Sequence, residues 1–87
     1  MKNISINELN KYKDNNTLLI DVRMPMEYMA NHLNGAINMP YTNVLSMLRS
    51  YSKDTKIILY CDRGINSTRV GKILESLGYT NVYILIK

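Results

Sequence analysis

The chain contains a single cysteine, Cys61, and the residues around it favour a chemical role for its thiol. An unbroken apolar run at residues 57–60 precedes it, which is typical of a strand buried on both faces of a parallel sheet. Apolar residues at helical spacing follow it, at Val70, Ile73, Leu74 and Leu77. Cys61 is therefore expected directly after a central strand, in a loop that leads into a helix N-terminus.

Such a position favours the ionised, nucleophilic form of a thiol. The first amides of a helix have no partner within the helix, and they carry the positive end of its dipole. They stabilise a thiolate, and Arg63 and Arg69 add positive charge nearby. Glycine allows several amides to converge on one anion. We expect the loop to form an anion-binding cradle made of six residues: Asp62, Arg63, Gly64, Ile65, Asn66 and Ser67.

The competing interpretation of Cys61 is a small buried apolar residue, as most lone cysteines are. Its place between a strand and a glycine-containing loop favours the functional interpretation. One cysteine cannot form an internal disulfide, which fits a reducing compartment. The N-terminal residues lack the apolar core of a secretory signal, so a cytoplasmic location is expected.

The composition of the chain limits the kinds of partner that the protein is expected to bind. The 87 residues are expected to form one domain, residues 1–87, with a formal net charge of +4. The lysines are scattered, and no basic stripe with interleaved aromatic residues points to nucleic acid. No apolar run is long enough to span a membrane. The single histidine, His32, has no ligand partners spaced around it, and no metal site is expected.

The rest of the chain alternates between short strands and helices. Further strands are predicted at residues 4–5, 17–22, 36–39 and 82–86. Further helices are predicted after a capping box of Ser5 and Glu8, at residues 26–31 with Pro25 in the first turn, and from a Thr42 cap to Tyr51. Gly78 is placed to end the helix after Cys61 in a left-handed turn.

This alternation predicts an α/β fold, with a mostly parallel sheet of about five short strands and helices on both faces. Ligands of such sheets bind beyond the carboxyl ends of the strands. Two segments contain side chains that could take part in chemistry, residues 21–23 and 61–67, and both lie at the carboxyl ends of predicted strands. We expect them to meet at the same edge of the sheet.

With these residues placed, the chain resembles the rhodanese-like domain in its small single-domain form. Residues 19–23, 25–28 and 32–40 are similar to the family's first signature, and residues 60–67 with 77–82 are similar to its active-site segment. The resemblance runs from about Ile4 to Leu85. It implies that Asp21 and Arg23 are a structural pair near the pocket, with Asp21 a hydrogen-bonding scaffold, and that His32 is structural.

The resemblance also implies a sulfurtransferase that needs no cofactor. The Cys61 thiolate would attack the outer sulfur of thiosulfate or of a persulfide donor, forming a Cys61 persulfide. Cyanide or a thiol, including a protein thiol, would then accept the sulfur. Loop amides would stabilise the anionic persulfide and the departing sulfite.

Two departures from the family pattern keep an alternative open. Asn66 stands where many members carry Arg, and the chain is expected to lack the usual tail beyond the last strand. Asp62 also places a negative charge beside the nucleophile, which opposes ionisation of the thiol. The alternative is a non-catalytic persulfide carrier or protein-interaction module. A phosphatase or arsenate reductase is disfavoured, because those loops place Arg six residues after the cysteine and this chain has Ser67 there.

Overall fold

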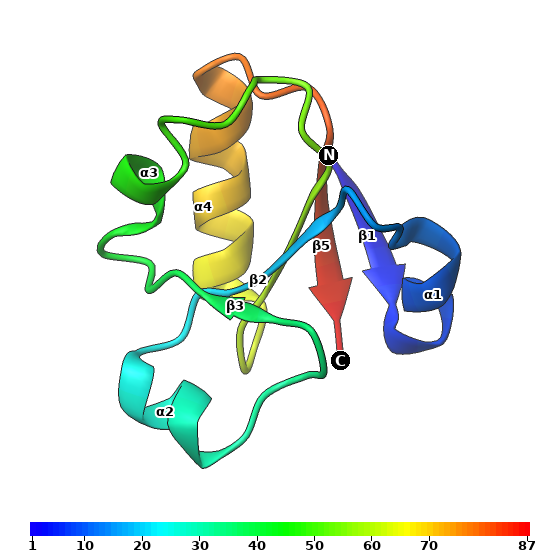
Figure 1. Ribbon diagram of the computed structural model, residues 1–87, viewed down its shortest axis with the longest axis vertical. Coiled ribbons are helices and arrows are strands. Elements are labelled where there is room, and N and C mark those ends of the chain that lie inside the picture. Colours follow the sequence, from blue (N-terminus) through cyan, green and yellow to red (C-terminus); the bar gives the residue numbers. More distant parts are fainter.

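Five parallel strands form one sheet in the computed structural model, which describes residues 1–87 (Figure 1). The strands are β1 (Lys2–Ser5), β2 (Leu18–Asp21), β3 (Ile37–Asn38), β4 (Ile57–Tyr60) and β5 (Val82–Ile86). Their spatial order is β1-β5-β4-β2-β3, and every neighbouring pair is parallel. The predicted fold class is confirmed, and β4 lies at the centre of the sheet.

Helices cover both faces of this sheet, as predicted. They are a 3-10 turn η1 (Ile6–Glu8) and the helices α1 (Leu9–Tyr12), α2 (Pro25–Ala30), α3 (Val44–Met47) and α4 (Ile65–Ser76). In Figure 1, α3 and α4 lie on one side of the sheet and α1 lies on the other, while α2 lies toward the end to which the strands point. None of these helices has the length and apolar character that crossing a membrane requires.

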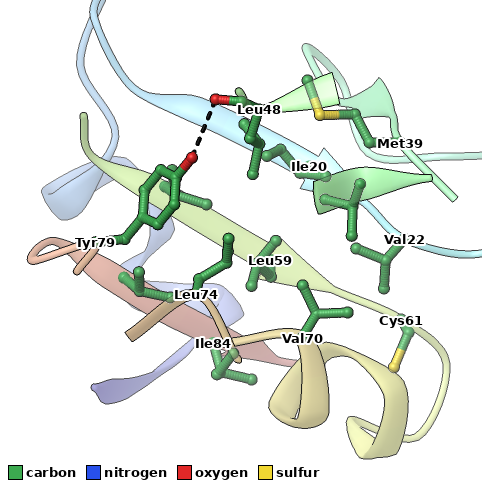
Figure 2. Close-up of a cluster of buried hydrophobic side chains, with 13 residues drawn as sticks. Ile20, Val22, Met39, Leu48, Leu59, Cys61, Val70, Leu74, Tyr79 and Ile84 are labelled. Carbon is green, nitrogen blue, oxygen red and sulfur yellow. Dashed lines mark hydrogen bonds between the residues drawn. The ribbon is translucent and has the colours of Figure 1, made fainter. Parts of the chain in front are cut away.

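Side chains alternate along β4 between two apolar clusters. Ile57, Leu59 and Cys61 belong to the larger cluster, which packs against α3 and α4 (Figure 2). Ile58 and Tyr60 belong to the smaller cluster on the opposite face. Because side chains of a strand point alternately to its two faces, Cys61 faces α4 and Tyr60 faces away from it.

The buried stripe of α4 differs from the predicted one. Val70 and Leu74 are buried, but Ile73 is 39% exposed and Leu77 is 52% exposed. The stripe instead contains Ser67, Val70, Gly71 and Leu74. A Cβ on Gly71 would lie 3.0 Å from Ile84 Cδ1 and 2.5 Å from Met1 Sδ, so small residues let α4 approach β5 closely.

The helix predicted from Thr42 to Tyr51 is wrong in both its cap and its length. Asn43 is the N-cap residue, and α3 ends after a single turn at Met47. The Leu48 carbonyl accepts hydrogen bonds from the Tyr51 amide at 3.0 Å and the Tyr79 hydroxyl at 3.1 Å. In a longer α-helix the Leu48 carbonyl would accept a hydrogen bond from the amide four residues later. The observed bonds to Tyr51 and Tyr79 instead favour a turn after Met47.

The other predicted elements differ from the structure by a few residues at most. The bounds of β4 and β5 match the apolar runs, whereas β2 and β3 are shorter than predicted. The Ser5 amide donates to Glu8 Oε1 at 3.0 Å, and Pro25 is the first residue of α2. Gly78 has a φ of 99°, which confirms the left-handed turn after α4.

Candidate active site

Cys61 follows β4 directly, and its sulfur contacts the start of α4. The Ser67 amide donates a hydrogen bond to Cys61 Sγ at 3.4 Å, and Ser67 Oγ lies 3.3 Å from the same sulfur. The side chain of Cys61 is only 7% exposed, and Figure 2 shows it at the edge of the apolar cluster. The residue therefore combines burial with two polar contacts that a purely apolar core position would not have.

The segment after Cys61 is shorter than the loop predicted for it. Only Asp62, Arg63 and Gly64 lie outside regular structure, and α4 already begins at Ile65. Gly64 is the N-cap residue, with a φ of 79° that favours glycine. Ser67 is therefore the third residue of α4, where the helix leaves amides without an intrahelical partner.

The backbone amides of residues 62–66 form no hydrogen bond to another group of the protein. They lie in the turn between β4 and α4, next to the sulfur and at the positive end of the α4 dipole. These backbone donors therefore have no partner within the protein.

A pocket of about 270 Å³ opens beside Cys61. It is lined by residues that follow β2, β3 and β4: Arg23, Met24, Glu27, Tyr41, Cys61, Asp62, Arg63, Ile65 and Asn66. A second pocket, of about 210 Å³, lies against the same turn and is lined in part by Gly64 and the end of β5. Cys61, Asp62 and Arg63 line both pockets, so the turn separates two openings near the sulfur.

Arg23 joins the end of β2 to the turn after β4. Its Nη2 lies 2.8 Å from Asp21 Oδ2 and donates to the Asn31 carbonyl at 2.6 Å. Its Nη1 lies 3.4 Å from Asp62 Oδ1. The segments 21–23 and 61–67 do meet at one edge of the sheet, and Arg23 makes the contact between them.

The charges around Arg23 hold one another in the ionised form. Burial alone would raise the pKa of Asp21, but hydrogen bonds from the side chain and backbone of Arg23 outweigh it, so that the pKa lies below the usual value. The hydrogen bond to Asp21 raises the pKa of Arg23.

Tyr60, by contrast, is held in its neutral form. Burial raises the pKa of Tyr60 to about 12, although the Leu33 amide donates to its hydroxyl at 3.0 Å.

The predicted site residues do not all lie in the pocket. Asp21 is fully buried on the Tyr60 side of the sheet and lines neither pocket, whereas Arg23 lines the larger one. His32 lies outside both pockets, with its ring stacked on that of Tyr28 at 3.7 Å between centroids. The structure contains no group of three or more His, Cys, Asp or Glu that could hold a metal ion.

Sequence reasoning missed three residues of the larger pocket: Met24, Glu27 and Tyr41. A usable signal was present for all of them, because each comes shortly after the carboxyl end of β2 or β3. In a parallel sheet these ends lie at the same edge as the end of β4. The same reasoning applies to Lys87, which follows β5 and lines the smaller pocket.

Comparisons with known proteins agree with this geometry. Thiosulfate sulfurtransferase PspE of Escherichia coli K12 is 37% identical over 65 residues, which cover 72% of this chain and 62% of PspE. An E. coli structure described as rhodanese with anions has a TM-score of 0.70 at 34% identity, covering 78% of this chain and 82% of that one. The human single-domain sulfurtransferase TSTD1 shares the fold, with a TM-score of 0.85 at 22% identity, over 98% of this chain and 88% of that one.

The chain spans less than two thirds of the curated relatives that it matches first: 62% of PspE and 53% of the Bacillus subtilis protein YqhL. The family model of the rhodanese-like domain covers nearly all of the sequence, residues 5–87. This match shows the family, and the parallel sheet and the placement of Cys61 directly after β4 agree with it. The chain belongs to the rhodanese-like domain family.

Proposed function

We propose that the protein is a sulfurtransferase that carries a sulfur atom on Cys61. The observation that carries the proposal is the contact of Cys61 Sγ with the amide and hydroxyl of Ser67, at 3.4 and 3.3 Å. Both groups can donate hydrogen bonds to a thiolate, and the N-terminus of α4 adds its dipole. Relatives named thiosulfate sulfurtransferase, PspE and GlpE, support the same activity.

The proposed reaction has two steps. The Cys61 thiolate attacks the outer sulfur of thiosulfate, a new bond forms from Sγ to that sulfur, and the sulfur–sulfur bond of thiosulfate breaks. Sulfite leaves with the electron pair, and a Cys61 persulfide anion remains. An acceptor such as cyanide or a thiol then attacks the outer sulfur of the persulfide, which regenerates the Cys61 thiolate. A persulfide donor would react in the same way and release its thiolate.

Two features support stabilisation of the anions in these steps. The amides of residues 62–66 are free to donate to the persulfide or to the departing group. Arg63 is exposed, lines both pockets and forms no ion pair, so its charge is available to an anionic donor. Asp21 and Arg23 act as scaffold, because their ion pair fixes Asp62 and with it the turn that contains these amides.

Thiocyanate formation from thiosulfate and cyanide tests the proposal. Wild type should turn over, and Cys61→Ser, which keeps the size and polarity of the side chain, should fall to the background rate. Circular dichroism of both proteins controls for folding. Equal thiocyanate formation by the two proteins would overturn the proposed role of Cys61. A folded wild type that forms no thiocyanate, yet accepts sulfur on Cys61 from another protein, would favour a persulfide carrier instead.

A further inference from the structure

The larger pocket is balanced in charge, which is unexpected for a site that would take a dianion. Its lining contains two cations, Arg23 and Arg63, and two anions, Glu27 and Asp62. Arg23 is further occupied by the buried Asp21, at 2.8 Å. Only the charge of Arg63 is free to attract an anion, and two carboxylates oppose it.

Both carboxylates are held at the pocket by contacts of their own. Asp62 Oδ1 lies 3.4 Å from Arg23 Nη1, although the side chain is 56% exposed. Glu27 Oε1 accepts a hydrogen bond from the Met24 amide at 3.4 Å, at the N-terminus of α2. These contacts place both carboxylates in the lining of the pocket.

Apart from Asn66, the rest of the lining is hydrophobic, and most of it is accessible. Met24 is 41% exposed, Tyr41 is 45% exposed and Ile65 is 60% exposed, and they come from three different segments of the chain. Together with Cys61 they make up the hydrophobic part of the pocket. An organic group attached to the reactive sulfur would cover these side chains and remove apolar area from water, which favours its binding.

We propose that the larger pocket selects sulfur donors that have an apolar organic group and no more than one negative charge, in preference to the thiosulfate dianion. Ile65 contributes the apolar contact, and Asp62 and Glu27 discriminate against the second charge. This inference rests on the proposed function, because it concerns the donor of the same reaction. Organic thiosulfonates and organic persulfides have the required chemistry.

The reaction with a thiosulfonate monoanion balances in the same way as that with thiosulfate. The Cys61 thiolate bonds to the terminal sulfur of the donor, and the bond from that sulfur to the sulfonyl sulfur breaks. The electron pair leaves on the sulfinate, and the persulfide anion stays on Cys61. Thiosulfate, methanethiosulfonate and benzenethiosulfonate therefore form a series that varies charge and apolar size in one reaction.

Apolar recognition is tested by comparing benzenethiosulfonate with methanethiosulfonate, with cyanide as acceptor. Ile65→Ala should lower kcat/KM for the benzene compound by up to about tenfold and leave that for the methane compound nearly unchanged. Ile73→Ala is the matched control, because it makes the same change in α4 at a residue outside both pockets. Equal effects of Ile65→Ala on both donors would overturn the apolar part of the proposal.

Charge discrimination is tested by comparing thiosulfate with methanethiosulfonate. Whatever it does to the overall rate, Asp62→Asn should raise the ratio of kcat/KM for thiosulfate to kcat/KM for methanethiosulfonate about fivefold, since one further charge of thiosulfate interacts with the removed carboxylate. Glu27→Gln should act in the same direction. Asp54→Asn removes a charge from the turn before β4, outside both pockets, and should leave the ratio unchanged.

These ratios are insensitive to the different intrinsic reactivity of the donors, because each donor is compared with itself across variants. A thiosulfate to methanethiosulfonate ratio that neither Asp62→Asn nor Glu27→Gln changes would overturn the charge part of the proposal. If every donor is turned over but each variant changes kcat/KM by the same factor for all donors, the proposed function stands and this inference fails. If no donor yields Cys61-dependent thiocyanate, both fail.

Discussion

Arg23 and Asp62 are 39 positions apart in the chain, and their side chains meet with Nη1 and Oδ1 3.4 Å apart. Arg23 is fixed in turn by Asp21 and by the Asn31 carbonyl. The end of β2 thereby supports the turn that follows the reactive cysteine. A change in this ion-pair cluster should affect both the stability of the fold and the geometry near Cys61.

Asp21→Asn should destabilise the protein by about 3 kcal/mol at neutral pH, because it leaves the buried Arg23 without its main counterion. The pKa of Asp21 is lowered in the folded protein. Its charge therefore contributes stability above the unfolded pKa of about 3.9, and this contribution is lost as pH falls through the folded pKa. Urea unfolding should show that the difference in the free energy of unfolding between wild type and variant is largest at neutral pH and becomes smaller in acid. A difference that does not depend on pH would contradict an ion-pair role.

Ser67→Ala should reduce sulfur transfer without unfolding the protein. The substitution removes the hydroxyl 3.3 Å from Cys61 Sγ but keeps the amide that donates to it. Hydrogen bonds to charged groups are worth about 1.5–3 kcal/mol, so kcat/KM should fall about tenfold to a hundredfold. Ser76→Ala is the control in the same helix, since its hydroxyl donates only to the Ile73 carbonyl. An unchanged rate in Ser67→Ala would show that the hydroxyl does not support the thiolate.

Gly64→Ala and Gly78→Ala form a matched pair at the two ends of α4. Both glycines have a positive φ, 79° and 99°, so alanine should cost about 1–2 kcal/mol of stability at either position. An added Cβ meets only Ile86 Cδ1, at 3.7 Å, at Gly64 and nothing within 4 Å at Gly78, so the cost is conformational. Thermal unfolding should respond alike to both changes, whereas thiocyanate formation should fall only in Gly64→Ala. Equal activity in both variants would show that the backbone conformation at Gly64 is not needed for catalysis.

Tyr60→Phe should cost about 1–3 kcal/mol, because the Leu33 amide loses its acceptor in a partly buried setting. The pKa of Tyr60 is raised to about 12 by burial. Its neutral phenol therefore contributes stability below the unfolded pKa of about 10, which is lost as pH rises toward 12. Denaturation at neutral and alkaline pH should show the wild type losing its advantage over the variant in base. Tyr51→Phe, at a half-exposed ring outside the pockets, is the control.

The sequence was most informative where apolar runs are unbroken. The bounds of β4 and β5 follow directly from such runs, and the glycine at position 78 ends α4 as predicted. The buried face of α4 could not be predicted from apolar residues, because Ser67 and Gly71 are buried for their small size. α3 ends at Met47, and the carbonyl of the next residue, Leu48, accepts a hydrogen bond from the Tyr79 hydroxyl, 31 positions along the chain. No local sequence pattern predicts such a contact.

The part of the site that one continuous segment forms was predictable from the sequence. The placement of Cys61 and Ser67 depends on local order along one strand, one turn and one helix. The pocket beside them requires side chains from three strand ends, and Tyr41 reaches it only because β3 pairs with β2. Long-range packing of this kind leaves no local pattern at Glu27 or Tyr41. Only their positions shortly after the ends of β2 and β3 could have indicated that they line the pocket.

Detection of sulfur on Cys61 in a single turnover tests the proposed role of this residue without the need for an acceptor. Wild type and Cys61→Ser are mixed with thiosulfate or methanethiosulfonate without an acceptor, desalted and measured by intact-protein mass spectrometry. Wild type should gain the mass of one sulfur atom, the peptide containing Cys61 should carry it, and cyanide should remove it. A wild type that gains no mass, or a Cys61→Ser variant that gains the same mass, would contradict the central role of Cys61.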